Sequence, residues 1–313
     1  MKTSRVPLPA AKSLFALLVV VCDLASRSCT AFVSPTGSYS AESRSHVATC
    51  GLRAGAVDVF GEELVLAKFK RLQTQSDIRG VSMDDVDLSV KEAYCIGVGF
   101  GLWLKKAVEV ESGEGREGRL RVSVGRDPRL SGFELSQAVI GGMTSHEGGC
   151  DVADCGLCTT PAMFMSCVTE GHLYDGAIMI TASHLPSHRN GFKFFTKSGG
   201  LNKQDIAEIV ALAAEQFGDG TFEVSEPRGG CCTKTDFLPV YQQQLKDMII
   251  GQVDKKGPDR DRPLEGLKVV VNAGNGMGGF LADTLSELGA DTSGSIHLKP
   301  DGTFPNHLAN PEV

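Results

Sequence analysis

Residues 176–181, Gly-Ala-Ile-Met-Ile-Thr, form an apolar run of the length of one strand. A run without polar alternation is typical of a parallel strand that helices cover on both faces. Strand-like segments at 120–125 and 150–154 come before it, and helical stretches at 132–145 and 161–168 lie between the three. Because alternating strands and helices form βαβ units, we expect an α/β fold in which helices sandwich a mixed or parallel sheet.

Further helices are expected on both sides of these units. Residues 85–109 carry apolar side chains at helical spacing, and Asn202 begins an amphipathic helix that runs to Phe217. Ser131 is followed three residues later by a glutamate, which is the spacing of a capping box at the start of the helix over 132–145.

A second domain is expected after residues 218–235, which are polar and rich in glycine and indicate a boundary. The segments expected beyond it are a helix over 236–250, a strand over 267–271 and a helix over 279–288. Since independent stability usually takes three or more strands, we expect this second domain to be incomplete. The predicted domains are a presequence at 1–57, a first domain at 58–230 and the truncated start of a second at 231–313.

The first residues are typical of a targeting signal. Lys2, Arg5 and Lys12 precede the short apolar run 14–21, and small residues follow near Ala31. From Phe32 the composition becomes rich in Ser and Thr, as in a transit peptide. This pairing resembles the two-part presequence of algae with complex plastids, so we expect a plastid protein. The alternative is secretion or residence in the endomembrane system.

The charge excludes one class of partner. The net charge is −7, although residues 1–57 hold six basic residues against two acidic ones. The remainder is therefore strongly acidic, which argues against a nucleic-acid binder, because such proteins need a basic face. The apolar run near the N-terminus is shorter than the roughly 20 residues that span a membrane, and we expect no membrane association.

Seven of the ten cysteines follow the presequence. Cys155 and Cys158 form one CxxC pair, but no second pair stands at the spacing of a zinc site. We expect these cysteines to be small buried residues, with redox control as the alternative.

The loop after the apolar run carries the residues of chemical interest, Thr181-Ala182-Ser183-His184-Leu185-Pro186 and then Arg189-Asn190-Gly191-Phe192-Lys193. Open α/β sheets bind ligands at the carboxyl ends of their strands, and Ser183 occupies that place. Its hydroxyl is a candidate nucleophile or phosphate carrier. Asn190-Gly191 predicts a reverse turn that brings Lys193 back on the far side.

Two other interpretations of this loop are open. A serine hydrolase is disfavoured because the GxSxG elbow is absent and because adjacent Ser and His side chains on an extended chain point apart. A turn that merely caps a strand is the alternative without chemistry.

A dinucleotide-binding module is a third alternative. Gly274, Gly276 and Gly279 have the GxGxxG spacing and follow the strand expected at 267–271. The acid expected about twenty residues on is not evident, because Asp291 is too close and Asp301 lies in a proline-flanked loop.

Seven segments in order resemble motifs of the α-D-phosphohexomutases, the phosphoglucomutase/phosphomannomutase family, from about residue 76 onward. They are Ser-Asp-Ile-Arg-Gly at 76–80, Val-Gly-Arg-Asp-Pro-Arg-Leu-Ser-Gly at 124–132, Thr-Thr-Pro at 159–161, Thr-Ala-Ser-His-Leu-Pro at 181–186, Asn-Gly-Phe-Lys at 190–193, Asn-Gly-Met-Gly-Gly at 275–279 and Pro-Asp-Gly-Thr-Phe-Pro-Asn-His at 300–307.

The resemblance implies a phosphotransferase-type isomerase that interconverts hexose 1-phosphate and hexose 6-phosphate, of glucose, mannose or both. Ser183 would be the phosphoserine, and Lys193 the general acid or base near the sugar hydroxyl. Arg79 would hold the phosphoserine oxygens, and His184 would assist proton transfer or orient the substrate. Arg126 and Asp127 are expected to form an internal pair.

The resemblance also implies Mg²⁺, a hexose phosphate substrate and a hexose 1,6-bisphosphate as activator. The chain departs from the family at Leu185, where Asn is usual, and it ends before the DGDxDR loop whose aspartates hold the metal. Ser183, through its phosphate, is the one metal contact expected here. Two explanations of these departures are open. The chain is a piece of a longer enzyme and is inactive alone, or it is a degenerate, non-catalytic homologue. Neither the hexose preference nor the oligomeric state is predicted.

Overall fold

The computed structural model describes residues 59–84, 86–112, 118–218, 229–253 and 258–310. The presequence expected at 1–57 lies outside the described residues.

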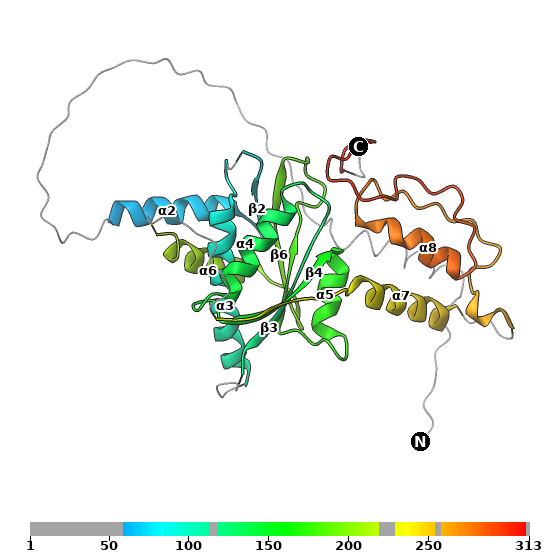
Figure 1. Cartoon of the computed structure of the whole chain (residues 1–313), viewed down its shortest axis with the longest axis horizontal. Helices are drawn as coiled ribbons and strands as arrows, with labels where there is room; N and C mark the ends of the chain where they lie inside the picture. Colours follow the sequence, from blue (N-terminus) through cyan, green and yellow to red (C-terminus); the bar gives the residue numbers. More distant parts are fainter. Residues whose placement is uncertain (1–58, 85, 113–117, 219–228, 254–257, 311–313) are drawn as a thin grey trace, which may run out of the picture. The chain divides into compact units, whose positions relative to one another are not determined.

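The described strands form one mixed sheet in the order β1-β2-β6-β5-β3-β4-β8, with β7 paired to β6 (Figure 1). Neighbours β5, β3, β4 and β8 run parallel, whereas β6, β2 and β1 add antiparallel pairs at the other edge. The strands are β1 Gln73–Thr74, β2 Asp77–Val81, β3 Leu120–Arg126, β4 Cys150–Leu157, β5 Gly176–Ile180, β6 Arg189–Thr196, β7 Gly199–Gly200 and β8 Cys232–Lys234. The expected α/β class with a mixed sheet is confirmed.

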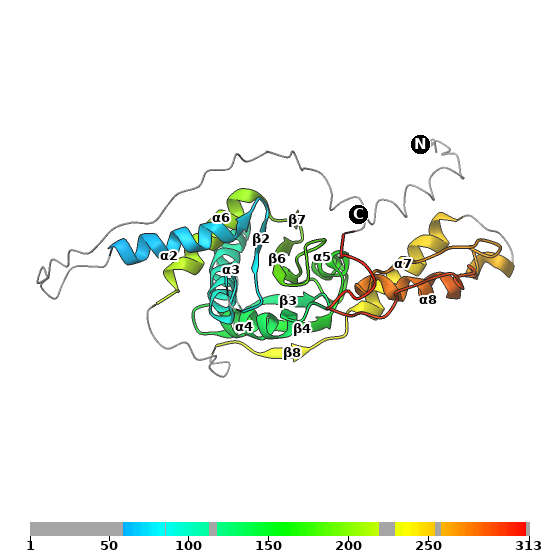
Figure 2. The ribbon, with the colours of Figure 1, turned by 90° about the horizontal axis from the view of Figure 1, so that it is seen from above.

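Helices cover both faces of this sheet (Figures 1 and 2). One layer holds α2 (Val59–Leu72), α3 (Val90–Ser112), α4 (Gly132–Thr144) and α6 (Lys203–Glu215), and the other holds α5 (Thr160–Val168), which contacts α7 (Leu238–Gln252). Every residue of β5 is buried. Ile178 and Ile180 pack into the core on the α3 side, whereas Ala177 and Met179 pack into the core on the α5 side. The absence of polar alternation in this run follows from burial on both faces.

Glycines bring α3 and α4 into backbone contact. A methyl carbon added at Gly97 of α3 would lie 2.3 Å from the carbonyl oxygen of Val139, and one added at Gly142 of α4 would lie 2.1 Å from the carbonyl oxygen of Tyr94. Such distances leave no room for a side chain, so glycine is required for this close approach.

Three helix starts test the capping predictions. Asn202 caps α6 as expected, with a complete capping box to Asp205. The helix expected from residue 85 instead begins at Val90, because Ser89 accepts from the Lys91 N–H and the Glu92 carboxylate accepts from the Ser89 N–H. The capping box at Ser131 is wrong: its side chain makes no cap bond.

The chain beyond α6 differs from the expectation in two places. The polar segment 218–235 contains β8, which pairs with β4 and so belongs to the first sheet. Residues 267–271 are not a strand, since two isolated bridges, Lys268 to Asp291 and Asn272 to Ile296, replace a continuous ladder. The expected helices are present as α7 and α8 (Phe280–Glu287), joined by the short 3₁₀ helices Pro258–Asp261 and Met277–Gly279.

Candidate active site

Ser183 lies in the segment 181–189, which we call the serine loop; it consists of the loop that joins β5 to β6 and the first residue of β6. The backbone of Ser183 is in the left-handed conformation, with φ of 57°. For a residue other than glycine this conformation costs about 1–2 kcal/mol, so its surroundings must hold it. The Ser183 N–H donates to the hydroxyl oxygen of Thr181 at 2.9 Å, and the Leu185 N–H donates to the carbonyl of Ala182 at 3.1 Å.

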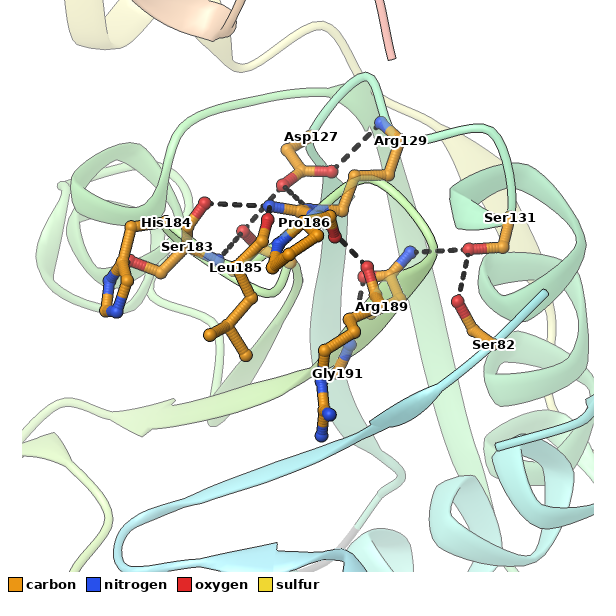
Figure 3. Close-up of polar contacts among 12 residues, drawn as sticks. Ser82, Asp127, Arg129, Ser131, Ser183, His184, Leu185, Pro186, Arg189 and Gly191 are labelled. Carbon is orange, nitrogen blue, oxygen red and sulfur yellow. Dashed lines mark hydrogen bonds and ion pairs between the residues drawn. The ribbon is translucent and has the colours of Figure 1, made fainter. Parts of the chain in front are cut away.

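Arg129 lies at the centre of the serine loop and is almost completely buried, with 1% of its surface exposed. Its guanidinium donates to four loop carbonyls and to one carboxylate (Figure 3). The acceptors are the carbonyl oxygens of Ser183 (2.8 Å), Leu185 (2.7 Å), Pro186 (2.7 Å) and Arg189 (3.0 Å), and Oδ2 of Asp127 (3.1 Å).

Asp127 joins this cation to the strand end. Its Oδ2 also accepts from the Thr181 hydroxyl at 2.6 Å, and its Oδ1 accepts from the Arg129 N–H at 3.1 Å. Burial raises the pKa of the Asp127 carboxyl, although Arg129 and Thr181 oppose the rise. Burial likewise lowers the pKa of Arg129. The expected pair of Arg126 with Asp127 is wrong, because the Arg126 guanidinium lies over the Phe133 ring at 5.6 Å.

Arg79 and Lys193 meet at a shared carboxylate. Oδ2 of Asp77 accepts from Nη2 of Arg79 at 2.8 Å and from Nζ of Lys193 at 2.7 Å. Arg79 and Asp77 lie on β2 and Lys193 on β6, two strands that pair directly. Nε of Arg79 is buried and has no hydrogen-bond partner among the described residues. A buried N–H without a partner is unusual and suits a ligand oxygen.

His184 and Asn190-Gly191 differ from what their sequence suggests. The chain at Ser183 is not extended, so Nδ1 of His184 lies 3.5 Å from the Ser183 hydroxyl oxygen, at the limit of a hydrogen bond.

The prediction of a reverse turn at 190–191 is wrong, because both residues belong to β6. Glycine is needed there because a methyl carbon at Gly191 would lie 2.1 Å from the carbonyl oxygen of Ile78 on β2.

A cavity of about 720 Å³ opens beside Ser183. Thr181, Ser183 and Asp127 line it on one side, and the segment 272–278, which we call the glycine loop, lines it on the other together with Phe304 and His307. Arg79, His184 and Lys193 are not among its lining residues. The structure therefore brings together Arg79 with Lys193, and Ser183 with His184, while no hydrogen bond or ion pair among the described residues joins the two pairs.

The glycine loop is the segment with the GxGxxG spacing. No strand directly precedes the glycine loop, because residues 267–272 form only isolated bridges. Gly274 has φ of 52° and packs against the imidazole of His307. A dinucleotide site needs the glycines directly between a strand and a helix, so this arrangement gives that alternative no support.

The donors for a metal ion are few in the described ranges. No group of three or more His, Cys, Asp and Glu side chains there could hold a metal ion. The described residues alone thus do not form a site for the Mg²⁺ that the resemblance implies, and no step below is assigned to it.

The cysteines are free in the part of the chain that the structure describes. Five of them are buried, Cys95, Cys150, Cys155, Cys158 and Cys167, as expected, whereas Cys231 and Cys232 are exposed. Burial raises the pKa of the Cys158 thiol to about 12. None of the described helices is long and apolar enough to cross a membrane.

Two residues of this site were not expected from the sequence. Arg129 stands in the same motif as Asp127, but the carbonyls that it binds lie 54 to 60 residues further along the chain. Asp77 binds Lys193 at a separation of 116 residues. The only available signal was their place inside motifs shared with a known family.

Comparisons with known proteins show what the chain is similar to. Residues 70–217 match the family described as phosphoglucomutase/phosphomannomutase, alpha/beta/alpha domain I. The chain is 35% identical over 237 residues to a phosphomannomutase/phosphoglucomutase of Pseudomonas syringae pv. tomato, covering 75% of this chain and 43% of that protein. It is 36% identical over 239 residues to a phosphoglucomutase/phosphomannomutase of Thermococcus kodakarensis, covering 75% and 46%.

A solved structure gives the same result. The crystal structure of a phosphoglucomutase/phosphomannomutase family protein from Burkholderia thailandensis matches with a TM-score of 0.56 and 29% identity, covering 78% of this chain and 46% of that one. The chain thus spans less than half the length of these relatives. The matched region, residues 70–217, contains the serine loop, β2 and β6, and it is this region that corresponds to the alpha/beta/alpha domain I of the phosphoglucomutase/phosphomannomutase family, the α-D-phosphohexomutases.

Proposed function

We propose that this protein takes part in phosphohexomutase catalysis, the exchange of a phosphoryl group between the 1- and 6-positions of a hexose phosphate through Ser183. The observation that carries the proposal is the place of Ser183. It follows the buried strand β5, is held in a left-handed conformation, and lines the cavity of about 720 Å³. The correspondence to domain I of this family supports the reaction class.

In the first transfer the phosphoryl group leaves the Ser183 oxygen for a free hydroxyl of the hexose phosphate. The bond from phosphorus to the serine oxygen breaks and a bond from phosphorus to the sugar oxygen forms. The sugar hydroxyl gives its proton to a base, and the leaving serine oxygen takes up a proton from an acid. The product is a hexose 1,6-bisphosphate, which reorients and returns its other phosphoryl group to Ser183. The reaction conserves atoms and charge because the serine ends as it began.

Lys193 is the proposed acid or base, and Asp77 orients its ammonium group at 2.7 Å. Arg79 is proposed to grip phosphate oxygens, since its buried Nε has no partner among the described residues and a guanidinium presents several N–H groups in one plane. His184 is exposed beside Ser183 and is proposed to orient substrate or pass a proton.

Mass spectrometry tests the proposal on a full-length enzyme in which residues 1–313 are followed by a DGDxDR metal loop, because this segment is expected to be inactive alone. After incubation with glucose or mannose 1,6-bisphosphate in Mg²⁺ buffer, phosphate should be found on Ser183, and Ser183→Ala should take up none because no other nucleophile replaces the hydroxyl. Ser187→Ala, in the same loop, is the matched control and should be phosphorylated normally. An unmodified Ser183 in the wild-type protein would contradict the assignment and would favour a non-catalytic homologue.

Replacing the proposed acid or base should slow transfer without removing the acceptor. Lys193→Ala should still become phosphorylated at Ser183, at a rate lower by about 10²–10⁴, the usual contribution of a general acid or base. Lys197→Ala, also a lysine but beyond the end of β6, is the control. Equal rates for Lys193→Ala and wild type would exclude Lys193 from the transfer.

We also propose that residues 1–57 direct the protein to a plastid. A reporter fused behind residues 1–60 should accumulate in plastids, and its accumulation in the medium would favour secretion instead.

A further inference from the structure

All the hydrogen-bonding capacity of the Arg129 guanidinium is used inside the protein. A guanidinium carries five N–H groups, one on Nε and two on each terminal nitrogen. Nε donates to Asp127, Nη1 to the carbonyls of Pro186 and Arg189, and Nη2 to those of Ser183 and Leu185. Arg129 does not line the cavity, so it has neither a free donor nor an open path to a ligand.

We propose that Arg129 is a positioning residue for phosphoryl transfer, which fixes the orientation of the Ser183 hydroxyl by holding the backbone of the serine loop from beneath. This inference rests on the proposed function of Ser183. It assigns to Arg129 no contact with substrate.

The geometry at Ser183 supports this role. The peptide groups on both sides of Ser183 are bonded to one ion pair. Its carbonyl accepts from Arg129 (Figure 3), and its N–H donates to the Thr181 hydroxyl, which in turn donates to Asp127. A residue with φ of 57° returns to the ordinary regions when such bonds are lost. Loss of either bond would therefore turn the hydroxyl away from its place at the cavity wall.

The four carbonyls that Arg129 binds come from both ends of the loop, from Ser183 to Arg189. Convergence of this kind needs a planar group with several donors in fixed directions. A lysine ammonium has three donors on a flexible stem and cannot satisfy five acceptors at once. Arg129→Lys keeps the positive charge opposite Asp127 but removes the planar group with five N–H donors. It therefore separates the effect of the charge from the effect of the hydrogen-bond geometry.

A second segment closes the outer face of the guanidinium. The ring of Phe304 lies 5.2 Å from the central carbon of the Arg129 guanidinium, and Gly302 packs so closely that an added methyl carbon would lie 2.1 Å from the Pro128 carbonyl oxygen. An aromatic ring over a buried cation adds a favourable interaction and keeps water from the five bonds. The segment that places Phe304 at the cavity thus also covers the Arg129 guanidinium, which holds the serine loop.

The test measures how fast Ser183 is phosphorylated by glucose 1,6-bisphosphate in the same full-length enzyme with its metal loop, together with the bisphosphate concentration that gives half the maximal rate. Arg129→Lys should lower the maximal rate about 10²-fold, as expected for a misplaced reacting group, and change the half-saturating concentration less than threefold. Arg126→Lys is the matched control, because that guanidinium binds none of the loop carbonyls, and it should react like wild type.

A second variant keeps the test valid if Arg129→Lys does not fold. Thr181→Val preserves shape but removes both hydrogen bonds of the hydroxyl, and should lower the maximal rate about tenfold at unchanged half-saturation. Because the two residues act on one serine, the double variant should be no slower than Arg129→Lys alone. A folded Arg129→Lys protein, or a Thr181→Val protein, that reacts at the wild-type rate would overturn the inference. Absence of phosphate on wild-type Ser183 would instead refute the proposed function.

Discussion

The serine loop and the glycine loop face the same cavity, yet they are organised around different chemical groups. The serine loop converges on a buried cation, Arg129, paired with Asp127. The glycine loop converges on a neutral amide: Nδ2 of Asn275 donates to the Lys299 carbonyl at 3.0 Å, and its Oδ1 accepts from the Asn306 amide at 2.7 Å. Asn275 is also buried and left-handed, with φ of 61°.

The difference between a charged and a neutral central group bears on how firmly each loop is held. Hydrogen bonds from a charged donor are shorter and stronger than those between neutral groups, and one guanidinium makes four of them to the serine loop. The amide makes two bonds and leaves the glycine loop freer to adjust. We therefore expect the loop with the proposed nucleophile to be the stiffer one. Its stability should depend on the Asp127–Arg129 ion pair, because removing one partner leaves the other buried without its counter-charge.

The largest effect should come from the ion pair. Asp127→Asn leaves Arg129 buried without its counter-charge, and breaking a buried pair in this way typically costs about 3–5 kcal/mol of unfolding free energy. Urea unfolding followed by circular dichroism measures the change. Asp236→Asn, at an exposed position, is the control and should change stability by less than about 0.5 kcal/mol. A loss below about 1 kcal/mol for Asp127→Asn would remove the distinction between the two loops.

A smaller effect should follow at the amide. Asn275→Gly keeps the left-handed backbone and removes two neutral hydrogen bonds, so the same measurement should show a loss of about 1–3 kcal/mol. Asn275→Ala should lose roughly 1 kcal/mol more, because alanine is strained at this φ. If both variants were as unstable as Asp127→Asn, charge would not be what separates the loops.

The smallest effect should come from Leu185, where the family usually has Asn. Leu185 contributes to the serine loop through its backbone, which donates to Ala182 and accepts from Arg129. Leu185→Asn leaves those bonds intact, and the phosphorylation rate of Ser183 should stay within about threefold, as for a change outside the bonded network. A gain of tenfold or more would mean that a side chain, and not only the backbone, sets the activity of this loop.

Local sequence information was sufficient where the partner lies close in the chain. Asn202 caps α6 through bonds to residues two and three positions later, and the polarity of β5 alone indicated burial on both faces. Ser131 had an equally good local pattern, but its hydroxyl bonds to Ser82 and Asn190, which are 49 and 59 residues away. Tertiary partners of that kind override a capping pattern.

The candidate site shows the same limit. Ser183 and Lys193 could be chosen because they stand in a short contiguous motif, whereas the guanidinium that shapes the loop could not. Asn190-Gly191 suggested a turn because the pair favours left-handed backbone, yet the glycine is present to let β2 approach. A glycine can be required by a left-handed turn or by the close approach of another strand. The Asn-Gly pair alone does not show whether another strand lies beside it.

The backbone contact between α3 and α4 has a consequence for how this protein can vary. Where side chains meet, a larger residue on one helix can be offset by a smaller one on the other, but Gly97 and Gly142 touch carbonyl oxygens that no substitution can shorten. We therefore expect neither Gly97 nor Gly142 to accept a larger residue, whatever changes on the other helix. The amide hydrogens of α3 and α4 should accordingly exchange with solvent only when the whole domain opens.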